Sequence, residues 1–356
     1  MTQAVPGLGG GPGAPRSADV ARLAGVSRKT VSRVFNDERY VSADVRRRVL
    51  QAAEELGYRL NGAARALASG RSRAIGVVAL GSSGYGTAAL LVGIERAVRD
   101  AHYALRVVNT ADGDPAGIAG AVESLLEQGV DGVLISEPID EGEFAVPVDV
   151  PVLFLGAPPS FTGPRTLIAS IGSDLLGRAA TDHLLDLGHD TVHHVAGPLR
   201  WYAARDRLTG WRSALAARSR PEPAFLECDW TAASGYAAGR ELAADPTVTA
   251  VFAAGDEMAV GVIRALTVAG LRVPEDVSVV GFDGEPVFAY LTPPLTTVCQ
   301  PFDAAAREGV RLLVHCVERP HEEPPQAQDP PVELVVRAST APPGPTRRRA
   351  PTGSRP

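Results

Sequence analysis

The spacing of apolar residues changes at about Ile75 in this chain of 356 residues. Before that position, apolar residues recur three and four apart within three short segments, which is the spacing of one helix face. After it, short apolar runs alternate with segments of helical spacing. The change predicts a small all-α region followed by a larger α/β region.

The second of the short segments, residues 26–36, has two distinct faces. Ser27 is a suitable N-cap, and Val31, Val34 and Phe35 share the inward side of the helix that it begins. The outward side carries no acid and consists of Arg28, Lys29, Ser32, Arg33 and Asn36. The segment therefore predicts a helix with a basic outer surface that is rich in hydrogen-bond donors.

The neighbouring segments complete a helix-turn-helix arrangement. Residues 18–24 form the first predicted helix, and Gly25 supplies the tight turn before the second. Ser42 is the expected cap of a third helix, which Gly57 ends as a left-handed residue. We expect a compact three-helix domain over residues 16–60.

Beyond Ile75 the alternation is that of βαβ units, which predicts parallel strands covered by helices on both faces. It occurs in two series separated near Ile171, so we expect two doubly wound parallel sheets in two lobes. Ligands bind at the carboxyl ends of such strands, which would face a cleft between the lobes. The predicted strands are residues 75–80, 104–109, 132–136, 152–155, 191–196, 225–229, 250–254 and 277–282. The predicted helices are residues 88–101, 118–128, 175–187, 203–218, 232–243 and 258–269.

Charge is distributed unevenly between the two regions. The whole chain has a net charge of -6 at pH 7. Residues 16–73 carry thirteen Arg or Lys against six Asp or Glu, a net of +7, which leaves -13 for residues 74–356. A basic helical module joined to an acidic one can dock on a polyanion only through its basic face.

The cysteines and the chain ends bear on the compartment. Cys228, Cys299 and Cys316 are far apart, so neither a disulfide framework nor a zinc site is indicated. The N-terminus lacks a secretory signal pattern, and no apolar run approaches the length of a membrane span. We expect a cytoplasmic protein, associated with the nucleoid when it is bound to DNA, with disordered ends at residues 1–15 and 341–356.

Short motifs follow one another in a definite order through the first 76 residues. They are Asp19-Val-Ala-Arg-Leu-Ala-Gly-Val-Ser-Arg-Lys-Thr-Val-Ser-Arg-Val, Val41-Ser, Leu56-Gly-Tyr58, Asn61, Ala64-Arg-Ala-Leu67 and Arg73-Ala-Ile-Gly76. In this order they resemble the lactose-repressor family of bacterial transcription regulators, and the resemblance extends to about Thr340.

The resemblance implies a hinge helix at residues 61–72 and an effector-binding and dimerisation domain at residues 73–340, built like the periplasmic sugar-binding proteins. The chain is then expected to cross between the lobes three times. The N-lobe would comprise residues 73–171 and 301–331, and the C-lobe would comprise residues 172–300 and 332–340.

Three basic residues of the second helix, Arg28, Lys29 and Arg33, are the candidates for reading bases. Arg and Lys can donate to the O6 and N7 acceptors of guanine in the major groove. Lys29 is also the only lysine of the chain. The alternative is that these residues form an ordinary solvated surface. The candidates for positioning the module on phosphates are Ser27, Thr30, Ser32, Asn36, Tyr40 and Asn61.

In the resembled family, the leucine that matches Leu67 is inserted into the minor groove at the operator centre. Such a wedge unstacks a base step and kinks the duplex, which gives the short hinge helix a surface on which to fold. The alternative is that Leu67 packs on the protein. Because two hinge helices are needed, the resemblance implies a homodimer on near-palindromic double-stranded operator DNA.

The resemblance also implies a small-molecule effector, a sugar or a sugar derivative, in the cleft. Arg207 matches a family arginine that donates hydrogen bonds to ligand hydroxyls or to a carboxylate. Asp283 matches a family acid that accepts hydrogen bonds from ligand hydroxyls. Trp230 matches a family aromatic residue that stacks on a sugar ring. For each, the alternative is surface ion pairing or core packing. The remaining candidates are Gln300, Phe302, Ser83, Tyr85 and Ser136.

Departures from the family pattern bear on which effector binds. Gly156 and Gly255 stand where relatives carry polar side chains, so two hydrogen-bonding groups are missing. Residues 82–87 add hydroxyls and a ring where simpler sugar repressors have an apolar wall. A plain galactoside is therefore not assumed, and the ligand is expected to be larger or differently oriented.

The leading interpretation is a transcription regulator that represses carbohydrate-utilisation genes under effector control; an activator or a constitutive DNA binder is the variant within this class. A periplasmic-type solute-binding protein is the alternative, against which the helix-turn-helix and the missing signal sequence count. No catalytic arrangement stands out, and a metal site at His189, His193 and His194 is disfavoured because adjacent strand residues point to opposite faces. We predict no catalysis, cofactor or metal.

Overall fold

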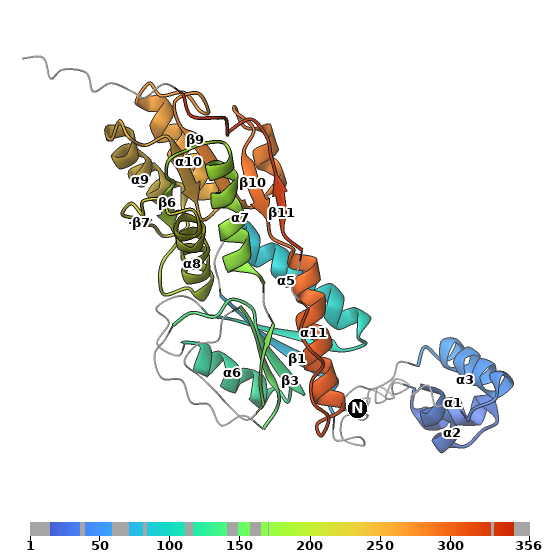
Figure 1. Cartoon of the computed structure of the whole chain (residues 1–356). Helices are drawn as coiled ribbons and strands as arrows, with labels where there is room; N and C mark the ends of the chain where they lie inside the picture. The colour runs from blue at the N-terminus through green and yellow to red at the C-terminus, as the bar shows by residue number, and fades with distance from the viewer. Residues whose placement is uncertain are drawn as a thin grey trace, which may run out of the picture. The chain divides into compact units, whose positions relative to one another are not determined.

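The chain folds as two units, residues 1–72 and residues 73–356. The computed structural model (Figure 1) describes residues 15–35, 40–58, 71–80, 84–110, 117–140, 149–156, 165–169, 171–328 and 331–344. Four of the predicted site residues lie outside these ranges, as do most of the expected hinge helix and most of both expected disordered ends. These four residues are Asn36, Asn61, Leu67 and Ser83.

The first unit contains three helices, α1 (Ser17–Ala24), α2 (Arg28–Phe35) and α3 (Ala43–Glu55). Gly25 and Gly57 have φ angles of 64° and 61°, so both adopt the left-handed conformation predicted for them. The helices pack around a small apolar core, whose fully buried members are Val20, Ala21, Ala24, Val31, Val34, Val49, Ala52 and Ala53.

Two of the three helix starts agree with the sequence. The Ser27 hydroxyl accepts the Thr30 amide at 3.1 Å, and the Ser42 hydroxyl accepts the Val45 amide at 3.4 Å. The α1 start differs, because the Asp19 carboxylate accepts the Arg16 amide at 2.9 Å. Here an acid at the third position of the helix satisfies the backbone amide of the residue that precedes the helix.

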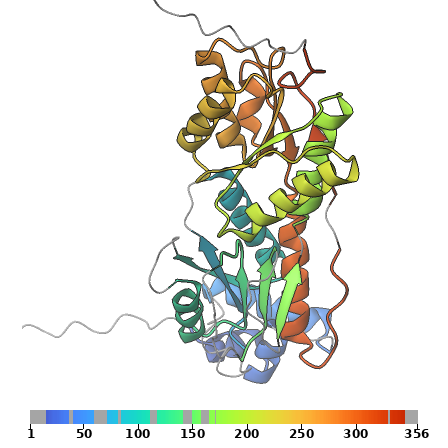
Figure 2. The same ribbon diagram turned by 60° about the vertical axis from the view of Figure 1, so that its left-hand side comes forward.

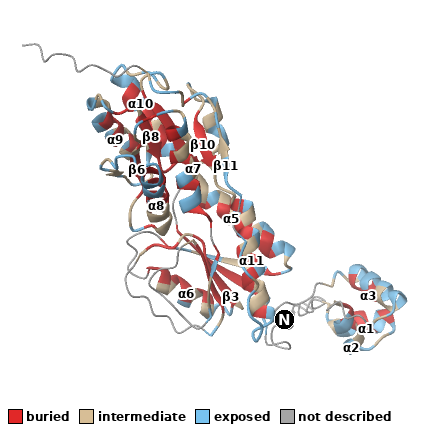
Figure 3. Ribbon diagram, viewed as in Figure 1, coloured by how far each residue is buried: buried red, intermediate tan, exposed pale blue. Residues whose placement is uncertain are grey.

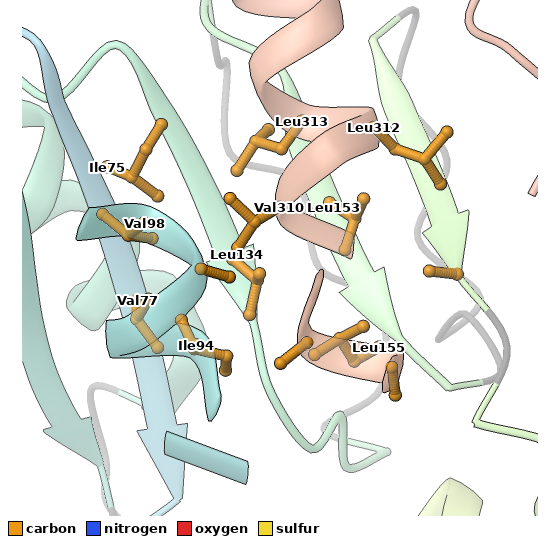
Figure 4. Close-up of a cluster of buried hydrophobic side chains, with 14 of the residues drawn as sticks. Ile75, Val77, Ile94, Val98, Leu134, Leu153, Leu155, Val310, Leu312 and Leu313 are labelled. Atoms are coloured by element: carbon orange, nitrogen blue, oxygen red, sulfur yellow. The ribbon is translucent and has the colours of Figure 1, made fainter. Parts of the chain in front are cut away.

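The first lobe of the second unit is a five-stranded parallel sheet in the order β2-β1-β3-β4-β5. Its strands are β1 (Ala74–Leu80), β2 (Ala104–Thr110), β3 (Gly132–Ile135), β4 (Val152–Leu155) and β5 (Thr166–Ala169). Helices α5 (Tyr85–Asp100) and α11 (Phe302–Glu318) cover one face, and α6 (Gly117–Glu127) covers the other. Figure 4 shows the core between the sheet and the α5 and α11 pair.

The second lobe is a six-stranded sheet in the order β11-β10-β9-β8-β6-β7, parallel except for β11. Its strands are β6 (His193–Ala196), β7 (Leu226–Glu227), β8 (Ala250–Ala253), β9 (Ser278–Asp283), β10 (Thr296–Cys299) and β11 (Glu333–Val335). Helices α7 (Ser173–Asp186) and α8 (Tyr202–Ala217) cover one face. Helices α9 (Ala232–Ala244) and α10 (Asp256–Val268) cover the other, and a 3-10 turn spans Pro286–Tyr290.

The prediction of two doubly wound sheets in two lobes is confirmed. Figure 3 shows the buried strands of each sheet between helices whose outer faces are exposed. The chain passes from β5 to α7, from β10 back to α11, and from α11 to β11, so each lobe contains non-consecutive segments (Figure 2). No helix within the described residues is long and apolar enough to cross a membrane.

The C-terminal segment is fixed on the second lobe beyond the predicted end of ordered structure at Thr340. The Ser278 hydroxyl donates to the Ala341 carbonyl at 2.9 Å, and the Ala341 amide donates to the same hydroxyl at 3.0 Å. The His189 ring lies between Thr249 Oγ1 and the Ala341 carbonyl, each 3.0 Å from one ring nitrogen. The expected tail begins at Ala341, and the structure holds this residue on the second lobe by these partly buried hydrogen bonds.

Candidate functional site

The basic surface of α2 is presented by the packing of its opposite face. Val31 and Val34 are buried in the three-helix core, and the Phe35 ring contacts the Tyr58 ring with centroids 5.6 Å apart. Arg28, Lys29, Ser32 and Arg33 are consequently exposed. The first turn of α2 contains no acid, so its positive N-terminal end adds to the side-chain charge.

Two of the predicted phosphate-positioning residues are engaged in local structure, and a third is highly exposed. Ser27 Oγ and Thr30 Oγ1 lie 2.9 Å apart at the start of α2. Tyr40 is 96% exposed, so nearly its whole ring and hydroxyl are available for contact. A helix whose outer face presents arginine, lysine and hydroxyl donors has the surface chemistry that binds phosphate and base acceptors.

In the second unit, Arg207 is the buried cation between the lobes. It lies on α8 with only 5% of its surface exposed, and its guanidinium donates to the Ala254 carbonyl at the end of β8. The guanidinium carbon lies 3.9 Å from the centroid of the Phe282 ring. Its Nε atom has no hydrogen-bond partner among the described residues, so one donor is left for a ligand.

Asp283 connects Arg207 to the second crossing between the lobes. Its Oδ1 lies 3.5 Å from Arg207 Nη2 and accepts Gln300 Nε2 at 2.6 Å. Phe302 begins α11 two residues after Gln300, and its ring meets the Tyr85 ring at an angle of 74° with centroids 6.1 Å apart. The structure thus brings together five of the predicted effector residues at the carboxyl end of β9 and the start of α5 and α11.

A narrow cavity lies between the lobes beside this group. Its empty volume is about 390 Å³, part of which is open to solvent. Arg207, Gln300 and Phe302 line it, as does Gly156, one of the two glycines singled out in the sequence. The other lining residues are Leu90, Glu137, Pro138, Leu155, Ile171, Ser173, Ala203 and Asp206.

Two carboxyl groups in this cavity were not predicted. Burial raises the pKa of Glu137 to about 7, although a hydrogen bond with Thr87 and the charge of Arg207 act in the opposite direction. Burial and the nearby Asp174 raise the pKa of Asp206 to about 6. One oxygen of Glu137 is buried without a hydrogen-bond partner among the described residues. The residues that line the cavity therefore include an unused acceptor as well as the unused donor of Arg207.

A third unpredicted acid, Asp256, forms hydrogen bonds with the segments that carry Asp283 and Gln300. Its carboxylate accepts the Thr297 hydroxyl at 2.6 Å and the Glu285 amide at 2.8 Å. Burial and the charge of Asp283 raise its pKa to about 7. Because three elements meet at this carboxyl group, Asp256 holds the loop after β9, and hence Asp283, in place.

Trp230 lies on the second-lobe side of the cleft and is not part of the cavity wall. Its ring rests on the backbone at Gly197, where a Cβ atom would collide with it. Arg207 Cζ is 5.1 Å from the Trp230 centroid, and the Trp201 ring meets it at 78° with centroids 5.8 Å apart. Trp230 Nε1 is buried without a partner among the described residues.

Ser136, the remaining described candidate, is 2% exposed at the end of β3, and its hydroxyl donates to the Val78 carbonyl at 3.2 Å. This hydrogen bond links the end of β3 to β1, so the Ser136 hydroxyl has a structural role. Its neighbour Glu137 is the residue that reaches the cavity. Glu137 follows the same apolar strand as Ser136, so the tendency of ligands to bind at the carboxyl ends of parallel strands could have made it a candidate as well.

The lobes are also joined directly by backbone contacts. Ile139 forms an antiparallel bridge with Trp201, and the Asp140 amide donates to the Arg200 carbonyl at 2.7 Å. The Asp140 carboxylate accepts Arg205 Nη2 at 2.9 Å. These contacts link the segment after Glu137 to the start of the helix that carries Arg207.

Comparison with known proteins assigns both units. Residues 18–61 match the family described as bacterial regulatory proteins, lacI family, and residues 181–340 match the periplasmic binding protein-like domain. The ribose operon repressor of Escherichia coli strain K12 is 36% identical over 329 residues, which cover 90% of this chain and 98% of that protein.

Solved structures agree with these matches. The lac repressor dimer bound to operator and the anti-inducer ONPF is 33% identical, with a TM-score of 0.74, and the match covers 91% of this chain and 98% of that one. The complex of the transcriptional regulator CelR with cellobiose is 32% identical, with a TM-score of 0.67, and the match covers 91% of this chain and 99% of that one.

Proposed function

Because this chain belongs to the lacI family of bacterial regulatory proteins, we propose that it represses carbohydrate-utilisation genes and that a sugar in the cleft controls its affinity for DNA. The observation that carries the proposal is the cavity between the lobes, in which Arg207 of one lobe and Glu137 of the other each leave a polar atom unused. A sugar hydroxyl both donates and accepts, so adjacent hydroxyls can satisfy both atoms.

The control mechanism follows from the position of the cavity. A ligand that contacts both lobes binds one lobe arrangement better than another and shifts the equilibrium by that difference in affinity. In our proposal the lobe arrangement decides how two copies hold their basic α2 helices on a near-palindromic operator. The similar lac repressor structure contains such a dimer on operator. Leu67 remains our candidate wedge in the minor groove, and the protein is expected to act at the nucleoid in the cytoplasm.

Base reading by α2 can be tested by fluorescence anisotropy with DNA from upstream of the gene. We expect Arg33→Ala to weaken specific binding by a factor of about 5 to 150, since an arginine that contacts guanine contributes about 1–3 kcal/mol. Arg240→Ala is the matched control, because it removes an exposed arginine from α9 in the second unit. If the two variants bind equally well, α2 is not the reading helix.

The effector part of the proposal is tested in the same assay with a panel of sugars. The active sugar should change operator affinity of the natural protein. Arg207→Lys should lose most of this response while it retains operator binding without sugar, because lysine keeps the charge near Asp283 but not the planar fork. A sugar response that survives Arg207→Lys unchanged would remove Arg207 from the effector site.

A further inference from the structure

Trp201 is a second-lobe residue whose side chain lies in the core of the first lobe. It directly precedes α8, and only 7% of its surface is exposed. Its indole belongs to the apolar cluster on the α6 face of the first sheet, together with Ile139 and Phe154. The antiparallel bridge with Ile139 fixes its backbone at the same point. Trp201 is thus held in position by the lobe that it contacts.

The opposite contact of Trp201 is Trp230. The two rings are 5.8 Å apart in an edge-on arrangement, and Trp230 is in turn supported by the Gly197 backbone and by the guanidinium of Arg207. An indole ring fixed on a glycine and bordered by an arginine has the make-up of a platform for a sugar ring. In this structure the space at its side is taken by Trp201.

Residues close to Trp201 line one end of the cavity. Pro138 and Ala203 both line the cavity, and each is a close chain neighbour of one partner in the bridge between Ile139 and Trp201. The Tyr202 amide also donates to the Pro138 carbonyl at 3.3 Å. Trp201 therefore lies next to the Pro138 and Ala203 end of the cavity, and its ring contacts Trp230 there.

We propose that Trp201 is a size filter that restricts the effector to a single sugar ring. Its indole, which is about as large as a pyranose, occupies the space beside Trp230 that a second ring of a disaccharide would need. This inference rests on the proposed function, since it concerns the same cleft. It replaces the expectation of a larger ligand with that of a smaller one.

The test is calorimetric titration of the full-length protein with ribose and glucose as one-ring probes and cellobiose as the two-ring probe. We expect the natural protein to bind one of the single-ring sugars at least tenfold more tightly than cellobiose. The selectivity ratio is the Kd for cellobiose divided by the Kd for the single-ring sugar. Trp201→Ala should lower this ratio at least tenfold, whereas Trp201→Phe, which keeps an aromatic ring at this position, should retain most of it.

Thermal unfolding shows whether the variant opens the intended space. An apolar cavity of this kind binds a small aromatic molecule, so free indole should raise the Tm of Trp201→Ala and leave that of the natural protein unchanged. If Trp201→Ala does not fold even with indole, Trp201→Leu, which opens only part of the space, must still lower the ratio severalfold.

Three results would overturn the inference. The first is a natural protein that binds cellobiose as tightly as the single-ring sugars. The second is a selectivity ratio for single-ring sugars over cellobiose that is unchanged in a folded Trp201→Ala or Trp201→Leu protein. This result would contradict the size filter but not the proposal of a sugar effector. The third is the absence of binding of all three probes to every protein, which would overturn the sugar effector together with the size filter.

Discussion

At the scale of single residues, the cleft combines charged side chains of one lobe with side chains that the opposite lobe brings against them. Asp283 contacts both Arg207 and Gln300, and all three residues were selected from the sequence. Glu137 and Trp201 were not, because their roles depend on what the opposite lobe brings against them. The position of Glu137 at a strand end could have made it a candidate, but neither this position nor that of a tryptophan before a helix reveals which residue of the opposite lobe it meets.

The raised pKa of Glu137 predicts a pH-dependent stability. Its folded pKa of about 7 exceeds the ordinary value of 4.5, so the folded state holds more protons between these values and its stability falls as pH rises through them. The shift corresponds to about 3 kcal/mol at most. Glu137→Gln removes the charge, so we expect the variant to be more stable than the natural protein at pH 8. At pH 4.5 the difference in unfolding free energy between the two proteins should be close to zero.

Urea unfolding of the two proteins at both pH values measures this difference. Glu241→Gln, on the exposed surface of α9, serves as the control and should change stability little at either pH. If the unfolding free energies of Glu137→Gln and the natural protein differ by the same amount at pH 4.5 and at pH 8, Glu137 is not a buried group that titrates between these values.

At the scale of helices and strands, apolar spacing located the elements from α1 to β9, except β5, within a few residues. The strands β5, β10 and β11 and the helix α11 were not predicted. β5 and β11 have only four and three residues, which is too few to establish alternation. β10 also has only four. α11 was not predicted, although its buried face includes large apolar residues at helical spacing, among them Phe302, Val310 and Leu313.

The start of α2 gives a prediction that separates folding from DNA contact. Ser27→Ala removes the acceptor for the Thr30 amide and should destabilise the first unit by about 1 kcal/mol. Ser27→Asp restores an acceptor but places a negative charge beside the surface proposed to meet phosphate. We therefore expect Ser27→Asp to keep the thermal stability and lose at least severalfold in DNA affinity.

Circular dichroism melting and anisotropy with the upstream DNA provide the two readouts. Destabilisation by Ser27→Ala with little direct loss of affinity would complete the expected pattern. If Ser27→Asp binds DNA as well as the natural protein, then the N-terminal end of α2 does not face the phosphate backbone.

At the scale of the whole second unit, the direct contacts between the lobes bias their arrangement. The ion pair between Asp140 and Arg205 is partly exposed, at 33% and 41% of their side chains, so its contribution is at most about 1 kcal/mol. If the effector prefers this lobe arrangement, losing the pair should weaken sugar binding by up to about fivefold.

A double-mutant cycle isolates this effect. Asp140→Ala and Arg205→Ala should each weaken sugar binding, and the double variant should be little worse than either one. The pair between Arg212 and Glu222, which lies within the second lobe at 2.9 Å, is the control, and its removal should leave sugar affinity unchanged. Full additivity of the Asp140 and Arg205 effects would show that the two residues act separately.

The threefold passage of the chain between the lobes has a consequence for synthesis on the ribosome. The first lobe lacks α11 until residue 318 has been made, and the second lacks its C-terminal hydrogen bonds until Ala341. The helix-turn-helix unit, in contrast, is complete after Tyr58 and can fold as soon as it leaves the exit tunnel. A message broken before the codon for Phe302 would therefore yield a folded helix-turn-helix unit joined to an incomplete second unit.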